Sequence, residues 1–221
     1  MSQSSVLFSL ATLLKSALQP KKHFPDDTEK QLNTSVVGIG IVLVLGTALL
    51  VASAMVNFKE IQLARSQVVA HYEQTKTIPL ISNPSPWRHL SFPIAWSVIF
   101  VVFAGLRHGA MAVFGDEKRN FLTGLAITIK AMAPLILIAI LHGIGNNLFP
   151  FAKPLEEGDA IIYRSYLLIF LFFCGIGWEA YISVQANMLS FSQNSGRAIL
   201  TWFTPWLAGI VFYAFIRFLA G

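Results

Sequence analysis

Charged side chains are scarce in this sequence. They make up 12% of its 221 residues, half of the roughly 25% that is usual in soluble domains. Hydrophobic residues make up 55%, and the mean hydropathy is +0.62. Because so little charge can neither cover a soluble surface nor keep a chain unfolded, these values exclude a soluble enzyme and a disordered protein. They indicate an all-α, polytopic membrane protein.

Paired cysteines and clustered histidines are also missing. The single cysteine, Cys174, excludes an internal disulfide and a thiolate metal cluster. The 5 histidines are dispersed, and the sequence contains neither an HExxH motif nor a GxSxG nucleophile motif. We therefore expect no catalytic residue, no cofactor, no metal site, no enzymatic activity and no small-molecule substrate.

Five stretches are long and apolar enough to cross a bilayer, which takes about 20 helical residues. They cover approximately residues 35–56, 90–114, 121–146, 163–190 and 196–219. Residues 115–120 have the composition of a turn between the second and third spans, and residues 58–75 that of a continuation of the first helix beyond the membrane. The sequence thus predicts a five-span membrane domain over residues 34–221.

Residues 1–33 precede this domain and have a different pattern. Apolar residues recur at helical spacing opposite a face of serine and threonine, which predicts an amphipathic helix in the membrane interface, followed by a basic linker. The apolar face consists of Val6, Leu7, Leu10, Leu13, Leu14 and Leu18. Packing of this face on the protein's own helices explains the pattern equally well.

Basic residues outnumber acidic ones. Lys plus Arg number 16 against 11 Asp plus Glu, which gives a formal net charge of +5. The cations are scattered between the apolar spans, so we expect them to meet the anionic headgroups of the lipid bilayer and not nucleic acid. Lys21, Lys22 and Lys30 precede the first span, whereas Lys59 and Arg65 follow it. This difference favours a cytoplasmic N-terminus.

Lys130 and Glu179 are the cation and the anion placed deepest in the spans. Because a central charge costs roughly 2.5–3.5 kcal/mol on insertion, we expect these two side chains to face one another as an intramembrane ion pair. Such a pair either braces the helices or takes part in a proton or ion relay. Arg107 and His108 end the second span, where we expect them to reach the headgroups.

Small residues in the spans predict close approach of helix backbones. They are Gly38, Gly40, Gly46, Gly175 and Gly177. In the fifth span, Pro205 lies between Trp202 and Trp206. This order predicts a kink flanked by aromatic side chains at the membrane interface.

Four segments carry a family resemblance. They are LLKSALQPKKHF (13–24), RHGAMAVFGDEKRNF (107–121), KAMAPL (130–135) and WEAYISVQANMLSFSQNSGRAIL (178–200). Together they resemble the Yip1 domain family in its prokaryotic form. The resemblance implies a five-helix protein of the prokaryotic cytoplasmic membrane, with a cytoplasmic N-terminus and no enzymatic activity. Eukaryotic members are linked to Rab GTPases, vesicle budding and membrane shaping, but this sequence lacks their long N-terminal region and D-L-[YW]-G-P motif, so Rab binding is not carried over.

Three functions fit this pattern. The first is a non-enzymatic, Yip1-like integral membrane protein that organises the membrane or a membrane protein complex. The second is a small transporter or channel that uses a buried Lys130–Glu179 pair, and the third is an accessory subunit of a larger membrane complex. We expect the partners to be other membrane proteins or further copies of the chain. Since only two charges lie deep in the spans, buried polarity is thin for an ion path, and the first function is favoured.

Overall fold

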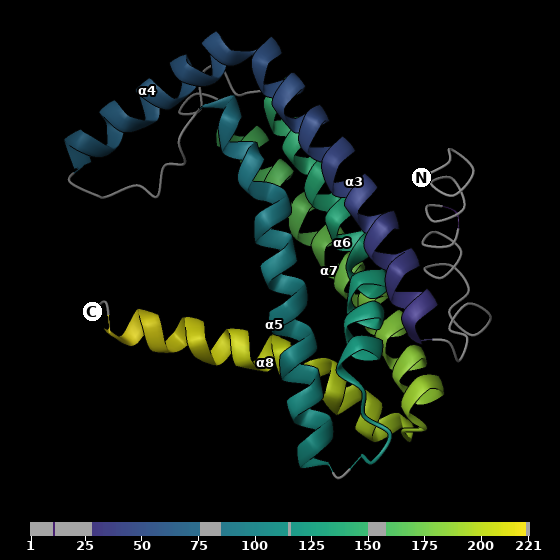
Figure 1. The fold of residues 1–221 in the computed structure, drawn as a ribbon. Coiled ribbons are helices and arrows are strands. Elements are labelled where there is room, and N and C mark those ends of the chain that lie inside the picture. The colour runs from purple at the N-terminus through teal and green to yellow at the C-terminus, as the bar shows by residue number, and fades with distance from the viewer. Residues whose placement is uncertain (1–10, 12–27, 76–84, 115, 150–157, 220–221) are drawn as a thin grey trace. The chain divides into compact units, whose positions relative to one another are not determined.

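The computed structural model describes residue 11 and residues 28–75, 85–114, 116–149 and 158–219. These residues form α-helices and a 3₁₀ helix, and no strand occurs among them, so the all-α prediction is confirmed. The elements are α3 (Thr28–Val56), α4 (Phe58–Thr75), the 3₁₀ helix η1 (Pro86–Ser91), α5 (Phe92–Val113), α6 (Phe121–Leu148), α7 (Gly158–Phe191) and α8 (Ser195–Leu219) (Figure 1). The predicted interfacial face of Val6, Leu7, Leu10, Leu13, Leu14 and Leu18 lies outside the described residues.

Five helical segments in the described part of the chain are long and apolar enough to cross a membrane, as predicted. They are Leu32–Val56, Pro86–Val113, Phe121–Leu148, Ile162–Phe191 and Ser195–Leu219. The second begins earlier than expected because η1 leads directly into α5, and Pro86 suits the first turn of a helix, where no N–H donor is needed. The chain is therefore a multi-pass membrane protein.

Contacts divide the chain into two compact units. Unit 1 consists of residues 1–41, 95–134 and 176–221, and unit 2 consists of residues 42–94 and 135–175. Helices α3, α6 and α7 each contribute many residues to both units, and α5 contributes only its first three residues to unit 2. In α6 the division falls directly after Pro134. Proline has no N–H, so the carbonyl of Lys130 lacks its helical donor at this point.

In unit 2, α3 and α6 approach one another closely through reciprocal contacts between glycines and large apolar side chains. A Cβ atom on Gly143 of α6 would lie 2.5 Å from Cδ2 of Leu50 on α3, so a larger residue there would require the Leu50 side chain to move. Ile140 of α6 lies against Gly46 of α3 in the same way. The prediction of close packing at Gly46 is confirmed, and Gly143 extends it.

The other glycines divide into two groups. A Cβ atom on Gly175 would lie 2.7 Å from Cδ2 of Leu135, so α7 and α6 are also in close contact within unit 2. Gly40 and Gly177, in contrast, have open space on the side where a Cβ atom would stand. For these two glycines the prediction of close helix packing was wrong.

Asparagine side chains fix the end of α6 in unit 2. Asn57 donates from Nδ2 to the carbonyls of Asn147 and Leu148, at 3.1 and 2.8 Å. These carbonyls lie in the last turn of α6 and have no partner within their own helix. Asn57 stands between α3 and α4, so the helix expected to continue from the first span is interrupted at this residue. Asn147 in turn donates to the carbonyl of Leu50 at 3.1 Å and to Ser53 Oγ at 3.0 Å.

The core of unit 1 is formed by α5, α6 and α7. Met111, Ile127, Ala186 and Phe191 form one buried apolar cluster, and Ala131 with Ile182 forms another. On α5 the buried residues recur at helical spacing and include Phe100, Ala104, Arg107 and Met111. An arginine therefore occupies a position in an otherwise apolar helix face.

In unit 1, an asparagine stands at the start of α6 and another at the start of α8. Asn120 Oδ1 accepts hydrogen bonds from the backbone N–H groups of Leu122 and Thr123, at 2.9 and 3.3 Å, at the start of α6. Asn194 Oδ1 accepts from the N–H of Arg197 at 2.9 Å at the start of α8. Both are N-caps, in which a side-chain oxygen satisfies the first amides of a helix. They confirm the predicted turn before α6 over its described residues, 116–120, and mark the short connection between α7 and α8.

Candidate functional site

The sequence indicates that Arg107 reaches the headgroups, but in the structure this side chain lies inside unit 1. Its side chain is 1% exposed and is among the largest fully buried side chains in the described part of the chain. Six further helical residues follow it before α5 ends at Val113, so at about 1.5 Å per residue it lies roughly 9 Å from the helix end. It shares a helix face with Ala104 and Met111, which directs it into the core.

The partner of Arg107 is Glu179 on α7. Arg107 Nη2 lies 2.5 Å from Glu179 Oε1, and Glu179 is 0% exposed. Arg107 Nη1 donates to Thr128 Oγ1 on α6 at 3.0 Å, and Ser183, one turn after Glu179, donates to Oε1 at 2.8 Å. Three helices thus meet at one buried, charge-assisted set of hydrogen bonds.

The two tryptophans of α8 also point to this carboxylate. Trp202 donates from its indole nitrogen to Glu179 Oε2, and the indole nitrogen of Trp206 lies 3.4 Å from the same oxygen. Residues four apart lie on one face of a helix, so both rings reach the same point. Trp206 also packs edge-on against Phe103 of α5, with ring centroids 5.3 Å apart. The indoles thus bind a carboxylate within unit 1, and the kink flanked by interfacial aromatics stays a prediction.

We call this group the Glu179 cluster; its members are Arg107, Thr128, Glu179, Ser183, Trp202 and Trp206. Both oxygens of the carboxylate accept hydrogen bonds. Arginine and tryptophan can only donate, so a proton bound to Glu179 would displace one of its donors. This arrangement suits a brace between four helices better than a group that takes up and releases protons.

Lys130 is buried in unit 1 as well. It is 1% exposed and lies on α6, four residues before Pro134. The burial expected for Lys130 and Glu179 is therefore confirmed, but the ion pair that the structure gives Glu179 is with Arg107. A direct pairing of Lys130 with Glu179 stays a prediction.

A second polar group lies in unit 1 where the α5–α6 turn meets the start of α8. Gln193 donates to Asp116 Oδ2 at 2.6 Å and to Thr201 Oγ1 at 3.1 Å. Arg197 Nη1 lies 3.5 Å from Asp116 Oδ1, and half of the Arg197 side chain is exposed. Asp116 itself is 7% exposed. This group joins the connection between α7 and α8 to the turn before α6, and the sequence had not indicated it.

Some buried polar atoms of unit 1 have no hydrogen-bond partner within the described residues. They are Arg107 Nε, Asn187 Nδ2, Gln193 Oε1 and His108 Nδ1. Asn187 follows Glu179 and Ser183 at intervals of four residues, so the three lie in a row along α7. Unit 1 therefore buries more polar side chains than Lys130 and Glu179, the two deep charges predicted from the sequence.

The chain matches no protein-family model, no curated protein and no solved structure. The class defined by the fold and the cluster is a helical, multi-pass membrane protein with a buried arginine–glutamate pair. Its activity has to be argued from the geometry of its own residues.

Proposed function

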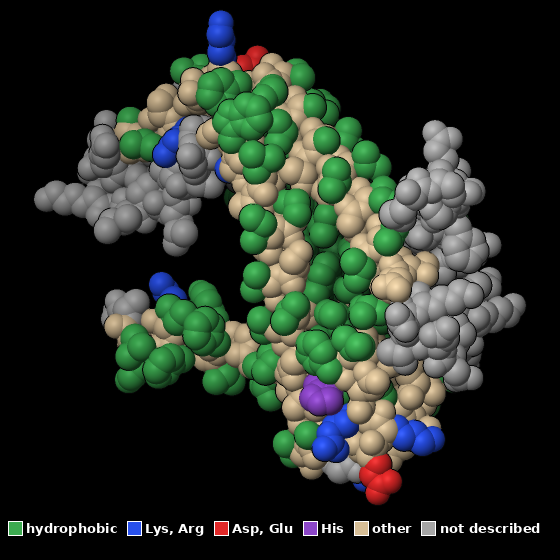
Figure 2. All heavy atoms as spheres, in the orientation of Figure 1, with side chains coloured by type: hydrophobic (Ala, Val, Ile, Leu, Met, Phe, Trp, Pro, Cys, Tyr) green, Lys and Arg blue, Asp and Glu red, His purple; other side chains and the backbone are tan. Residues whose placement is uncertain are grey.

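We propose that this protein is a non-enzymatic, Yip1-like integral membrane protein that organises a membrane protein complex. The observation that carries the proposal is the C-terminal half of α8, residues 209–219, which we call the α8 arm. Every residue of the arm is exposed, and most are large and apolar. Figure 2 shows hydrophobic side chains along it, and in Figure 1 it extends away from α5.

The first half of α8 differs sharply from the arm. Ala198, Thr201 and Pro205 are buried in unit 1, and Trp202 and Trp206 are bound to Glu179. Among the described residues, the helix is thus anchored over its first three turns and exposed over its last three. The Glu179 cluster fixes the anchored half and so determines the direction in which the arm leaves unit 1.

The arm is rich in side chains that form the centres of protein interfaces. Phe212, Tyr213, Phe215 and Phe218 are 64%, 66%, 56% and 83% exposed. Aromatic residues are enriched in interface cores, where they provide large contact areas with few rotatable bonds. We therefore assign the arm to contact with another membrane protein or a second copy of the chain, which also accommodates the role of an accessory subunit.

Site-specific photo-crosslinking in native membranes tests the proposal. A photoreactive phenylalanine analogue at Phe212 should give a discrete protein adduct, and two differently tagged copies of the chain should show whether the adduct is a homo-oligomer. The matched control is the same analogue at Val101 of α5, which is 54% exposed and should yield lipid adducts only. Lipid adducts alone at Phe212, Phe215 and Phe218 would remove the arm as a protein contact.

The second candidate is a small transporter or channel, and one observation favours it. Arg107 Nε, Asn187 Nδ2 and Gln193 Oε1 are buried without partners in the described chain, as groups lining a path for water or ions would be. Reconstituted into proteoliposomes, a transporter should carry flux that Lys130→Met together with Glu179→Gln abolishes while the protein stays folded. An absence of wild-type flux for protons, Na⁺, K⁺ and Cl⁻ would eliminate this candidate.

A further inference from the structure

Two polar groups of unit 1 lie at different depths along the same pair of helices. Glu179 of α7 pairs with Arg107 of α5, which precedes it by 72 positions. Gln193, just after α7, bonds to Asp116, just after α5, which precedes it by 77 positions. Because the two separations are similar, α5 and α7 run parallel here. The interval between the Glu179 cluster and the second group can therefore be followed along both helices. We call the second group the Asp116 group; its members are Asp116, Gln193, Arg197 and Thr201.

Asn187 lies in the interval between the two groups. It follows Glu179 by eight residues on α7, which corresponds to about 12 Å along the helix. Its neighbour Ala186 belongs to the same buried cluster as Met111 of α5. Met111 follows Arg107 by one turn in the direction of the Asp116 group. Both helices thus place Asn187 between the two groups.

Buried polar atoms without a hydrogen-bond partner among the described residues occur in both groups and between them. They are Arg107 Nε, Asn187 Nδ2 and Gln193 Oε1. The three side chains are 1%, 2% and 5% exposed, so bulk solvent does not reach them. Buried polar groups in folded proteins are nearly always hydrogen-bonded, either to protein or to ordered water. These three atoms therefore require partners inside unit 1.

The chemistry of the three atoms identifies the partner. Arg107 Nε and Asn187 Nδ2 are donors, whereas Gln193 Oε1 is an acceptor. An anion would satisfy only the two donors, and a cation would satisfy only the acceptor. Water both donates and accepts hydrogen bonds, so water satisfies all three atoms.

Space for water lies beside Gly124 of α6. Gly124 is buried, yet a Cβ atom placed on it would meet no side chain and no other helix within 4 Å. Thr128, one turn further along α6, donates to the carbonyl of Gly124 at 2.8 Å and accepts from Arg107. Ile127 shares this helix face and packs in the same cluster as Met111. The open space therefore faces the interior of unit 1, on the side of Arg107 that leads to the Asp116 group.

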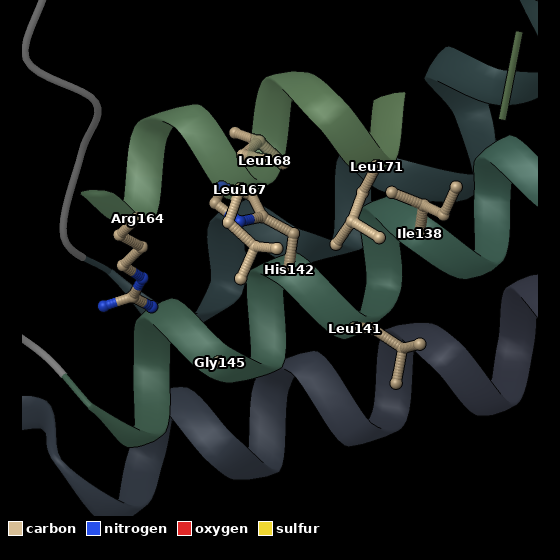
Figure 3. Close-up of a pocket in the computed structure, with 8 residues that line it drawn as sticks. All are labelled: Ile138, Leu141, His142, Gly145, Arg164, Leu167, Leu168 and Leu171. Carbon is tan, nitrogen blue, oxygen red and sulfur yellow. The ribbon is translucent and has the colours of Figure 1, made fainter. Parts of the chain in front are cut away.

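The groove between α6 and α7 in unit 2 provides a contrast. Five of its eight lining residues are leucine or isoleucine (Figure 3). Leu141, one of them, is 68% exposed, so this groove opens outward. An apolar lining offers water few hydrogen bonds, and apolar cavities stay dry. The space beside Gly124 differs because it is enclosed and polar atoms lie along the same interval.

We infer that unit 1 binds a chain of internal water molecules, which runs from the Asp116 group past Asn187 and Gly124 to the Glu179 cluster. Its outer end is at Asp116, because Arg197, which contacts that carboxylate, is 51% exposed. Internal waters of this kind are structural, and each typically makes about three hydrogen bonds to buried polar groups. The inference needs neither the α8 arm nor transport, since fixed waters also satisfy these atoms in a protein that carries no flux.

X-ray radiolysis of the full chain in detergent micelles, followed by mass spectrometry, tests the inference. Radiolysis converts bound water into hydroxyl radicals, which oxidise neighbouring methionines to the sulfoxide, while a dissolved scavenger removes radicals from the bulk solvent. Met111 and Met132 are 0% and 1% exposed and both belong to unit 1, so they are matched in burial. Met111 should be oxidised about tenfold faster than Met132, because only Met111 lies along the proposed waters.

Filling the space beside Gly124 is the second test. Gly124→Leu should displace water and bring the oxidation rate of Met111 to within about twofold of that of Met132. The matched control is Gly105→Leu, which places the same side chain on an exposed glycine of α5 with open space around it and should leave both rates unchanged. Circular dichroism verifies that both variants are folded.

Equal oxidation of the two methionines in the wild-type chain would overturn the inference, and this comparison needs no variant. Equal effects of Gly124→Leu and Gly105→Leu in folded protein would overturn it too. The result is separate from the tests of the proposed function. Lipid adducts alone at the α8 arm, or an absence of flux, would leave the difference between Met111 and Met132 as expected.

Discussion

Breaking the ion pair between Arg107 and Glu179 should strongly destabilise the protein. Both side chains are at most 1% exposed, and their charged atoms lie 2.5 Å apart. Removing one partner from a buried pair leaves the other charge uncompensated, which costs about 3–5 kcal/mol. Glu179→Gln retains one oxygen, which can still accept from Trp202 but not also from Ser183 at the other position, so we place it near 3 kcal/mol. Arg107→Met also removes the bond to Thr128, so we place it near 4 kcal/mol.

The double variant Arg107→Met with Glu179→Gln should cost much less than the sum of the two single changes. It leaves no unpaired charge, and the glutamine oxygen still accepts from the indole of Trp202. We expect a coupling free energy of about 2–3 kcal/mol, which is at the upper end for residues in direct contact. The double variant should therefore be about as stable as the weaker of the two single variants.

Reversible unfolding in mixed micelles measures these free energies. Increasing fractions of SDS unfold the detergent-solubilised protein, followed by far-ultraviolet circular dichroism. Arg217→Met serves as the control, because this arginine is exposed and should change stability by no more than about 0.5 kcal/mol. Additive effects of Arg107→Met and Glu179→Gln would refute the pairing. Stronger coupling of Lys130→Met than of Arg107→Met to Glu179→Gln would show that Lys130 is the true counter-ion.

Three other changes test the packing of the two units. Asn147→Ala should cost about 1–3 kcal/mol in SDS unfolding, because it removes the buried hydrogen bonds from α6 to the Leu50 carbonyl and Ser53 Oγ on α3; a loss below 0.5 kcal/mol would contradict this role. Gly143→Leu should cost at least about 1–3 kcal/mol by overpacking against α3, whereas Gly109→Ala, which meets open space, should be neutral or slightly stabilising. Exchanging the charges, Lys130→Glu with Glu179→Lys, should restore the folded yield lost in either single reversal if these two residues pair, and an unrescued yield would end that prediction.

The five spans could be predicted from the sequence because a bilayer imposes a length and a composition that a single pass along the chain reveals. Which side chains of different helices contact one another cannot be predicted from the length and composition of the spans. The sequence pattern predicts a headgroup anchor at Arg107, because charged residues near the ends of spans usually reach the headgroups. Its register with Phe100 and Met111, and the six helical residues after it, are the signals that point inward.

The hydrogen-bond partner of Trp202 and Trp206 could not be predicted from the sequence either. Trp202 and Trp206 are typical of interfacial aromatics, and their spacing of four residues was available from the sequence. That spacing shows that the rings share a face, but not that the face meets a carboxylate on α7. Only the packed structure reveals that Glu179 takes donors from two other helices, α5 and α8, and from Ser183 of its own helix, since a fully buried carboxylate must find all its partners within the protein.

The ion pair has a consequence for how the protein is made. Arg107 precedes Glu179 by 72 residues, and at about 5–20 residues per second the ribosome takes about 4–14 s to supply the glutamate. During this interval α5 carries an arginine without its counter-ion, so it has to stay close to headgroups or to the insertion machinery. Arrival of α7 removes that constraint, and the indoles of α8 then complete the set of donors. The order of synthesis thus becomes an order of assembly, in which the second span reaches its final depth only after the fourth has entered the membrane.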